Sequence, residues 1–74
     1  MGKLPRVSGT EMIRFLQTQG FLVRRIRGSH HVVQRGTQHS TIPVHGNQAL
    51  RIGTLRSILR DIDLSPKDFE KLWR

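Results

Sequence analysis

The residues best suited to chemistry in this chain lie in one short stretch, Arg24-Arg25-Ile26-Arg27-Gly28-Ser29-His30-His31. A histidine imidazole titrates near neutral pH, so it can both accept and donate a proton in a cell. Arginine guanidinium groups hold phosphates through charge-assisted hydrogen bonds. A proton carrier beside a phosphate clamp is what RNA cleavage requires. The same stretch also fits a simpler interpretation, a basic hairpin that binds without catalysis.

The charge of the chain favours a polyanionic partner. The 74 residues carry 13 Lys and Arg against five Asp and Glu, a formal net charge of +8. No acidic residue lies between Glu11 and Asp61, whereas arginines occur throughout that span. An uninterrupted positive field favours phosphates or an acidic protein as the partner. The missing carboxylates also exclude two-metal and paired-carboxylate catalysis from this region.

The length and composition indicate one small domain over residues 1–74, because a chain this short builds a single modest core. It contains no apolar run of 18 residues, so we expect no membrane span. The N-terminus lacks the apolar segment of a signal peptide. The absence of cysteine excludes disulfides and thiolate metal sites, and a reducing cytoplasm is the expected compartment.

The first helix is predicted over residues 9–19. Ser8 and Glu11 have the spacing of a capping box, in which each side chain accepts a hydrogen bond from the other residue's backbone N–H. The apolar residues that follow recur at helical spacing, and Gly20 supplies the left-handed conformation that ends a helix.

Two further helices are predicted in the C-terminal part. One is expected after Gly53, with Thr54 as its cap. The other is short, with Ser65 as its cap and Pro66 at its first position. The residues predicted to face the core are Leu55, Ile58, Leu59 and Ile62 in the former and Phe69, Leu72 and Trp73 in the latter.

Three β-prone segments lie between the helices, and we predict strands over residues 21–27, 30–35 and 39–44. Gly28-Ser29 is the turn between the first two. Side chains alternate along a strand, so His30 and His31 must face opposite sides of the sheet. The two predicted faces of the second strand are His30, Val32 and Gln34 on one side and His31, Val33 and Arg35 on the other. Pro43 cannot donate to a ladder, which places the third strand at a sheet edge.

The predicted fold class is therefore α+β, with element order α-β-β-β-α and a short C-terminal helix. Sequential strands joined by short turns form an antiparallel meander. Two amphipathic helices can cover one face of this three-stranded sheet and leave the other open. This layout is that of the double-stranded-RNA-binding domain, which recognises RNA by shape and backbone.

Five blocks of sequence carry a resemblance to a known family. They are Ser8-Gly9 with Glu11, Gly20-Phe21, Gly28-Ser29-His30, Ile42-Pro43-Val44-His45, and Gly53-Thr54-Leu55-Arg56-Ser57-Ile58-Leu59-Arg60. In this order and in a chain of this length, they resemble the HicA toxins, the small ribonucleases (mRNA interferases) of bacterial HicA–HicB toxin–antitoxin modules. The resemblance implies a double-stranded-RNA-binding-like fold, endonuclease activity on mRNA, and inhibition by a HicB antitoxin that covers the active site. The family's catalytic histidine falls on His30, with His31 as the alternative.

The expected chemistry uses His30 as a general base on a ribose 2′-hydroxyl or as an acid toward the leaving 5′-oxygen. Gly28 would let the backbone approach a phosphate, and Ser29 would donate a hydrogen bond to it. The second proton carrier stays open between His31, His45, an ordered water, and no strong carrier at all, in which case the enzyme would be slow. The candidate RNA contacts are Lys3, Arg6, Arg24, Arg25, Arg27, Arg35 and Arg51. The spacing of the four histidines fits no standard zinc site, so no metal or other cofactor is expected.

Three classes of function remain open from the sequence. The favoured one is a metal-independent endoribonuclease acting as a toxin. The second is a non-catalytic RNA-binding module of similar fold, which would protect RNA without shortening it. The third is an interaction domain whose basic face serves a protein partner, which would show no RNA affinity at moderate salt.

Overall fold

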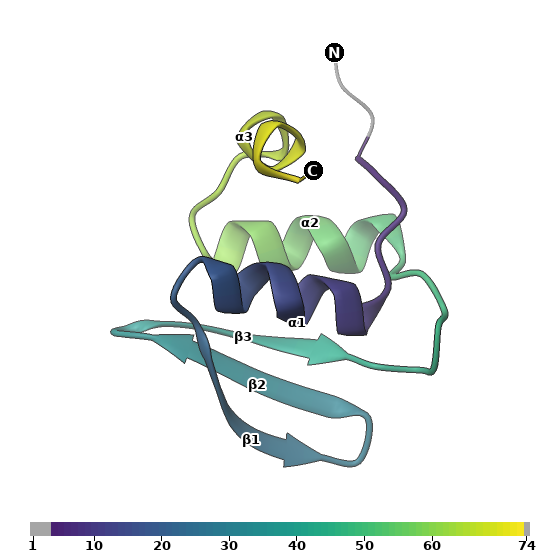
Figure 1. The fold of residues 1–74 in the computed structure, drawn as a ribbon, viewed down its shortest axis with the longest axis vertical. Coiled ribbons are helices and arrows are strands. Elements are labelled where there is room, and N and C mark those ends of the chain that lie inside the picture. Colours follow the sequence, from purple (N-terminus) through teal and green to yellow (C-terminus); the bar gives the residue numbers. More distant parts are fainter. Residues whose placement is uncertain (1–3, 74) are drawn as a thin grey trace.

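The structure is a computed structural model that describes residues 4–73, so the predicted RNA contact Lys3 lies outside the described residues. Within that range the helices and strands follow one another in the predicted order (Figure 1). They are α1 Gly9–Thr18, β1 Leu22–Arg27, β2 His30–Arg35, β3 Gln38–Pro43, α2 Ile52–Asp61 and α3 Pro66–Leu72. The predicted α+β fold, similar to the double-stranded-RNA-binding domain, is therefore confirmed. Between residues 4 and 73 no helix has the length and apolar character needed to cross a membrane.

The three strands form an antiparallel sheet in the order β1-β2-β3. Two-residue turns join neighbouring strands, and each turn begins with a glycine of positive φ, Gly28 at 59° and Gly36 at 60°. A glycine in this position is typical of the type II′ turn, whose twist matches that of the flanking strands. β3 is an edge strand, as Pro43 predicted, and Pro43 lies opposite His30 on β2.

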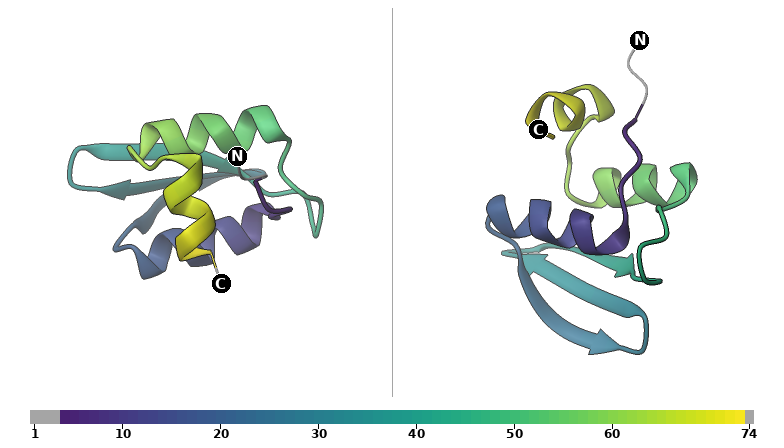
Figure 2. Two further views of the ribbon diagram at one scale, coloured as in Figure 1. Left: turned by 90° about the horizontal axis from the view of Figure 1, so that it is seen from above. Right: turned by 45° about the vertical axis from the view of Figure 1, so that its right-hand side comes forward.

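The two faces of the sheet have different environments. Helices α1 and α2 cover one face and leave the other uncovered (Figures 1 and 2). On β2, Val33 is fully buried toward the helices, whereas His30, three positions earlier and therefore on the opposite face, is exposed. The predicted alternation is therefore confirmed. We call the uncovered side the open face. The strand register places on it Leu22, Arg25, Arg27, His30, Val32, Gln34, His39, Thr41 and Pro43.

The core fills the space between the sheet and the helices. The predicted stripe of α2 is buried in full: Leu55, Ile58, Leu59 and Ile62. Helix α3 adds Phe69, whose ring meets that of Phe15 edge-on at 4.9 Å between centroids. Trp73 packs against the same pair, but Leu72 is 50% exposed, so its predicted core position is wrong. Leu72 instead lies at the rim of the contact with α1, where it borders a hollow with Phe15 and Thr18.

The predicted N-cap residue is the observed one in two of the three helices. Ser8 and Glu11 form the predicted capping box, with N···O distances of 2.9 and 3.1 Å, and the Ser65 hydroxyl accepts the Asp68 N–H. The prediction of Thr54 as the cap of α2 is wrong. α2 begins at Ile52, and Arg51 occupies the N-cap position without a side-chain hydrogen bond. The Leu50 N–H donates to the Val7 carbonyl at 2.7 Å. This bond fixes the backbone just before Ile52, so α2 can begin there and not at Thr54.

The capping box makes the stability of the fold depend on pH. The backbone N–H of Ser8, followed by its hydroxyl, holds the pKa of Glu11 below its ordinary value of 4.5. A lowered pKa in the folded state stabilises the fold above about pH 4.5, and this contribution is lost as the pH falls through the lowered value. We expect Glu11→Gln to lower the melting temperature at neutral pH. The difference from the wild type should vanish in acid, and thermal melts across pH 2.5 to 7 check this; a difference independent of pH would contradict it.

Candidate active site

His30 stands at the start of β2, beside the Gly28-Ser29 turn and on the open face. Its side chain is exposed to solvent. Its direct partner across the β1–β2 ladder is Arg27. Side chains directly opposite each other in an antiparallel pair lie on one face with Cβ atoms about 4.5–5.5 Å apart. The hairpin therefore places a proton carrier beside a cation that can hold a phosphate.

A β-bulge in β1 decides which arginines share the face of His30. Val23 pairs with Val33 and Arg25 pairs with Val32, so Arg24 is the extra residue of the bulge. In a regular strand Val23 would lie on the same side as Arg25. The bulge lets Val23 pack toward the core while Arg25 stays on the open face. Nothing in the local sequence marks Arg24 as a bulge, so the sequence does not predict this feature.

His31 lies on the other side of the sheet, as predicted. It pairs with Ile26 on β1 and with the fully buried Ile42 on β3. Its ring is partly buried, and its Nδ1 atom is enclosed without a hydrogen-bond partner among residues 4–73. The imidazole of His31 is therefore separated by the sheet from that of His30, and the two histidines cannot act on the same phosphate.

The segment after β3 brings His45 to the same end of the molecule. The Val44 N–H donates to the Ser29 carbonyl at 2.7 Å, which ties this segment to the turn that precedes His30. Gly9 at the start of α1 packs so closely on the Pro43 carbonyl that a side chain there would collide with it. His45 is exposed and lines a hollow of about 460 Å³ together with Gln48 and Arg51. The structure thus gathers His30, His45 and Arg51 at one end of the fold.

The conformation of the turn gives Gly28 a structural role, and its approach to a phosphate stays a prediction. Gly28 has a φ of 59°, a conformation that residues with a side chain rarely adopt, and no atom lies within 4 Å of where a Cβ would stand. The turn itself therefore requires the glycine. Ser29 is partly buried, and its carbonyl is already used by Val44.

The predicted RNA contacts fall into two groups. Those with exposed side chains nearer the end that holds His30 and His45 are Arg6, Arg25, Arg27 and Arg51. Arg6 directly precedes Val7 and Arg51 directly follows Leu50, and the Leu50 N–H is hydrogen-bonded to the Val7 carbonyl. Arg6 and Arg51 therefore lie near each other at that end. Arg24 is exposed as well, but it borders a hollow at the other end of the sheet together with Gly20 and Gln34.

Arg35 lies at the far end of β2, beside the same hollow as Arg24. Its Nη1 donates to the Gln19 carbonyl at 2.6 Å and its Nη2 to the Gln38 Oε1 at 2.7 Å. The guanidinium also lies 4.5 Å from the centroid of the Phe21 ring. These contacts bind the end of α1 to the sheet, where a cation also offsets the negative end of the helix dipole.

We therefore expect Arg35→Ala to lower the free energy of unfolding by about 1–2 kcal/mol, because it removes two charge-assisted hydrogen bonds and a cation–π contact. RNA affinity should fall less than in Arg27→Ala. Urea denaturation checks the first effect, with Arg24→Ala, an exposed arginine of the bulge, as the control. A stable Arg35→Ala protein that binds RNA as poorly as Arg27→Ala would assign Arg35 to the RNA surface instead.

Comparison with known proteins identifies the family of this chain. The family model of the HicA toxin of bacterial toxin–antitoxin systems matches residues 9–64, from the first residue of α1 to three residues beyond α2. The chain belongs to the HicA toxin family. It is thus the toxin of a toxin–antitoxin module, and an antitoxin is its partner. The comparison with curated proteins found no match.

The matched range of this HicA toxin contains every residue of the candidate active site. Gly28, Ser29, His30, His31 and His45 all lie inside it, and α3 lies outside it. Across residues 4–73 no group of three or more His, Asp or Glu side chains is arranged to hold a metal ion. The charged and titratable groups available on the open face are histidine and arginine.

Proposed function

We propose that this HicA toxin is a metal-independent endoribonuclease that cleaves mRNA in the cytoplasm, with His30 as its general acid or base. The observation that carries the proposal is the place of His30. It is exposed, it stands on the face that the helices leave open, and it is paired directly with Arg27.

The proposed reaction needs no group beyond RNA and protein side chains. A ribose 2′-oxygen forms a bond to the adjacent phosphorus while the bond from that phosphorus to the 5′-oxygen of the next nucleotide breaks. His30 takes the proton of the 2′-hydroxyl or supplies one to the leaving 5′-oxygen, a transfer that typically contributes ~10²–10⁴-fold. Arg25 and Arg27 stabilise the charge that builds on the phosphate oxygens.

The second proton carrier in this proposal is His45. His31 is held on the helix-facing side of the sheet, away from the phosphate that His30 would contact. His45 is exposed and directly follows Val44, whose N–H is bonded to the Ser29 carbonyl beside His30. Two imidazoles of opposite protonation state would give a bell-shaped dependence of rate on pH.

The partner in this proposal is a HicB-type antitoxin that covers the active site. The chain has a formal charge of +8, and its open-face arginines create a field that attracts an acidic protein and speeds its association. The same arginines attract RNA, so RNA and antitoxin would compete for one surface.

Incubation of the purified protein with single-stranded mRNA in EDTA tests the enzymatic part. We expect the RNA to be shortened into discrete fragments with EDTA present. Bound RNA that is protected but stays full length would support the alternative, a non-catalytic RNA-binding module. RNA that neither binds nor shortens at moderate salt would point to an interaction domain and contradict both readings.

A further inference from the structure

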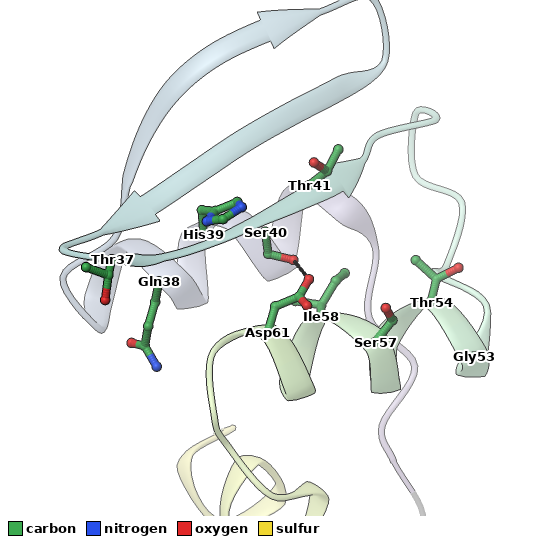
Figure 3. A pocket seen from close by; sticks show the side chains of 10 residues that line it. All are labelled: Thr37, Gln38, His39, Ser40, Thr41, Gly53, Thr54, Ser57, Ile58 and Asp61. Atoms are coloured by element: carbon green, nitrogen blue, oxygen red, sulfur yellow. Dashed lines mark hydrogen bonds between the residues drawn. The ribbon is translucent and has the colours of Figure 1, made fainter.

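The structure contains a second surface, a polar groove between β3 and α2 on the side of the molecule away from β1 (Figure 3). Its volume is about 680 Å³. Residues 37–41 form one wall, and α2 forms the other with the side chains of Thr54 and Ser57. Where the two walls meet, the buried Ser40 hydroxyl donates to the Asp61 Oδ2 at 2.8 Å.

The charge of this groove differs from that of the rest of the protein. Among the described residues that line it there is one carboxylate, Asp61, and no lysine or arginine. Asp61 is also the last residue of α2, where the helix dipole disfavours a negative charge. The groove therefore lacks the cations that would hold a phosphate backbone, and its one carboxylate can attract a positively charged group from a partner. The groove is therefore suited to a protein and unsuited to RNA.

The wall formed by β3 offers free backbone groups. Arg35 and Gln38 flank a two-residue turn, so they form a hydrogen-bonded pair, and the pairs alternate from there along the ladder. His39 and Thr41 fall in non-hydrogen-bonded pairs, which turns their N–H and C=O groups away from β2 and toward the groove. Within residues 4–73 these groups bond to no loop or helix. This also explains why both residues line the groove although their side chains stand on the open face.

The other edge strand of the sheet, β1, is protected against pairing with a further strand, whereas β3 is not. β1 carries arginines and a bulge at Arg24, and both features discourage pairing with a further strand. β3 has neither between His39 and Thr41. Pro43, which lacks an N–H, limits any added ladder to the part of β3 that faces the groove.

We propose that the edge of β3 receives an extended strand of the antitoxin, which pairs with the backbone of His39 and Thr41 and places a basic side chain against Asp61. The inference rests on the antitoxin partnership proposed above and adds a second surface, which adjoins the hollow of His45 at Thr54. Main-chain hydrogen bonds supply the affinity in this mode of recognition, and the groove between β3 and α2 selects the side chains.

Thr41→Pro tests the proposal, with Thr41→Val as the matched control. Both variants lose the hydroxyl, but only proline removes the outward N–H, and the ladder to β2 does not use that N–H. The affinity of each for the purified antitoxin of the same module is measured by calorimetry. We expect Thr41→Pro to bind about tenfold or more weakly and Thr41→Val to bind like the wild type. Equal affinity of the two variants would overturn the proposal.

Hydrogen exchange gives a second readout that needs no variant. The amides of His39 and Thr41 should exchange rapidly in the free toxin and slowly in the complex. A complex that forms without protecting these two amides would overturn the proposal, even if Thr41→Pro fails to fold. Protection in the free toxin together with a dimeric mass would show that a second copy occupies the edge, which would also overturn it. RNA cleavage is assayed without antitoxin, so a failure of the nuclease proposal leaves this result interpretable.

Discussion

His30→Ala should lower the rate of RNA cleavage by ~10²–10⁴-fold, because the imidazole transfers a proton in the transition state. RNA affinity should change little, since the arginines of the open face provide the electrostatic contribution to binding. The fold should also be preserved, because His30 is exposed. Single-turnover cleavage of a labelled RNA, with the affinity measured separately, checks the two effects independently.

The matched control for His30 is His39. It is the same residue type, it is exposed, and it stands on the same open face, but it pairs with Gln34 at the other end of β2. His39→Ala should cleave RNA like the wild type. If His30→Ala cleaves as fast as His39→Ala while both bind RNA, His30 is not the catalytic residue.

The second large effect concerns the phosphate-binding surface. The double variant Arg25→Gln/Arg27→Gln should bind RNA at least about tenfold more weakly at low salt. Each lost phosphate contact lowers the slope of log affinity against log salt by about 0.7 for a single strand, so the slope should fall by about 1.4. Titrations of one RNA at several salt concentrations measure both quantities.

Arg56→Gln/Arg60→Gln provides the control for this effect. The two residues are exposed on α2, four positions apart, and their removal changes the net charge by the same amount. Because α2 covers the opposite side of the sheet from the open face, we expect a small loss of affinity and a nearly unchanged slope (Figure 1). Equal losses in the two double variants would mean that overall charge, and not the open face, governs RNA binding.

Local sequence signals predicted most of the fold. The capping box of Ser8 and Glu11, the Gly-initiated turns and the apolar stripe of α2 each act over a few residues, and each is present in the structure. The opposite faces of His30 and His31 also followed from the alternation of a strand. These features could be read from the sequence because short-range geometry determines them.

The features that the sequence did not predict depend on contacts between distant segments. The bulge at Arg24 arises where Val23 must reach the core, and Arg35 is held by Gln19 at the end of α1. The start of α2 before Thr54 follows from the bond between Leu50 and Val7. The groove beside β3 exists only because α2 folds back along that edge (Figure 3). Neither residue spacing nor composition carries this information.

The chemical identity of the RNA ends produced in EDTA tests the central claim most directly. If a 2′-oxygen attacks the phosphate while His30 moves the proton, the fragments must end in a 2′,3′-cyclic phosphate on one side and a 5′-hydroxyl on the other. Mass spectrometry of the fragments from a defined RNA distinguishes these ends. Fragments with a 3′-hydroxyl and a 5′-phosphate would contradict the account, because a water molecule would then be the nucleophile.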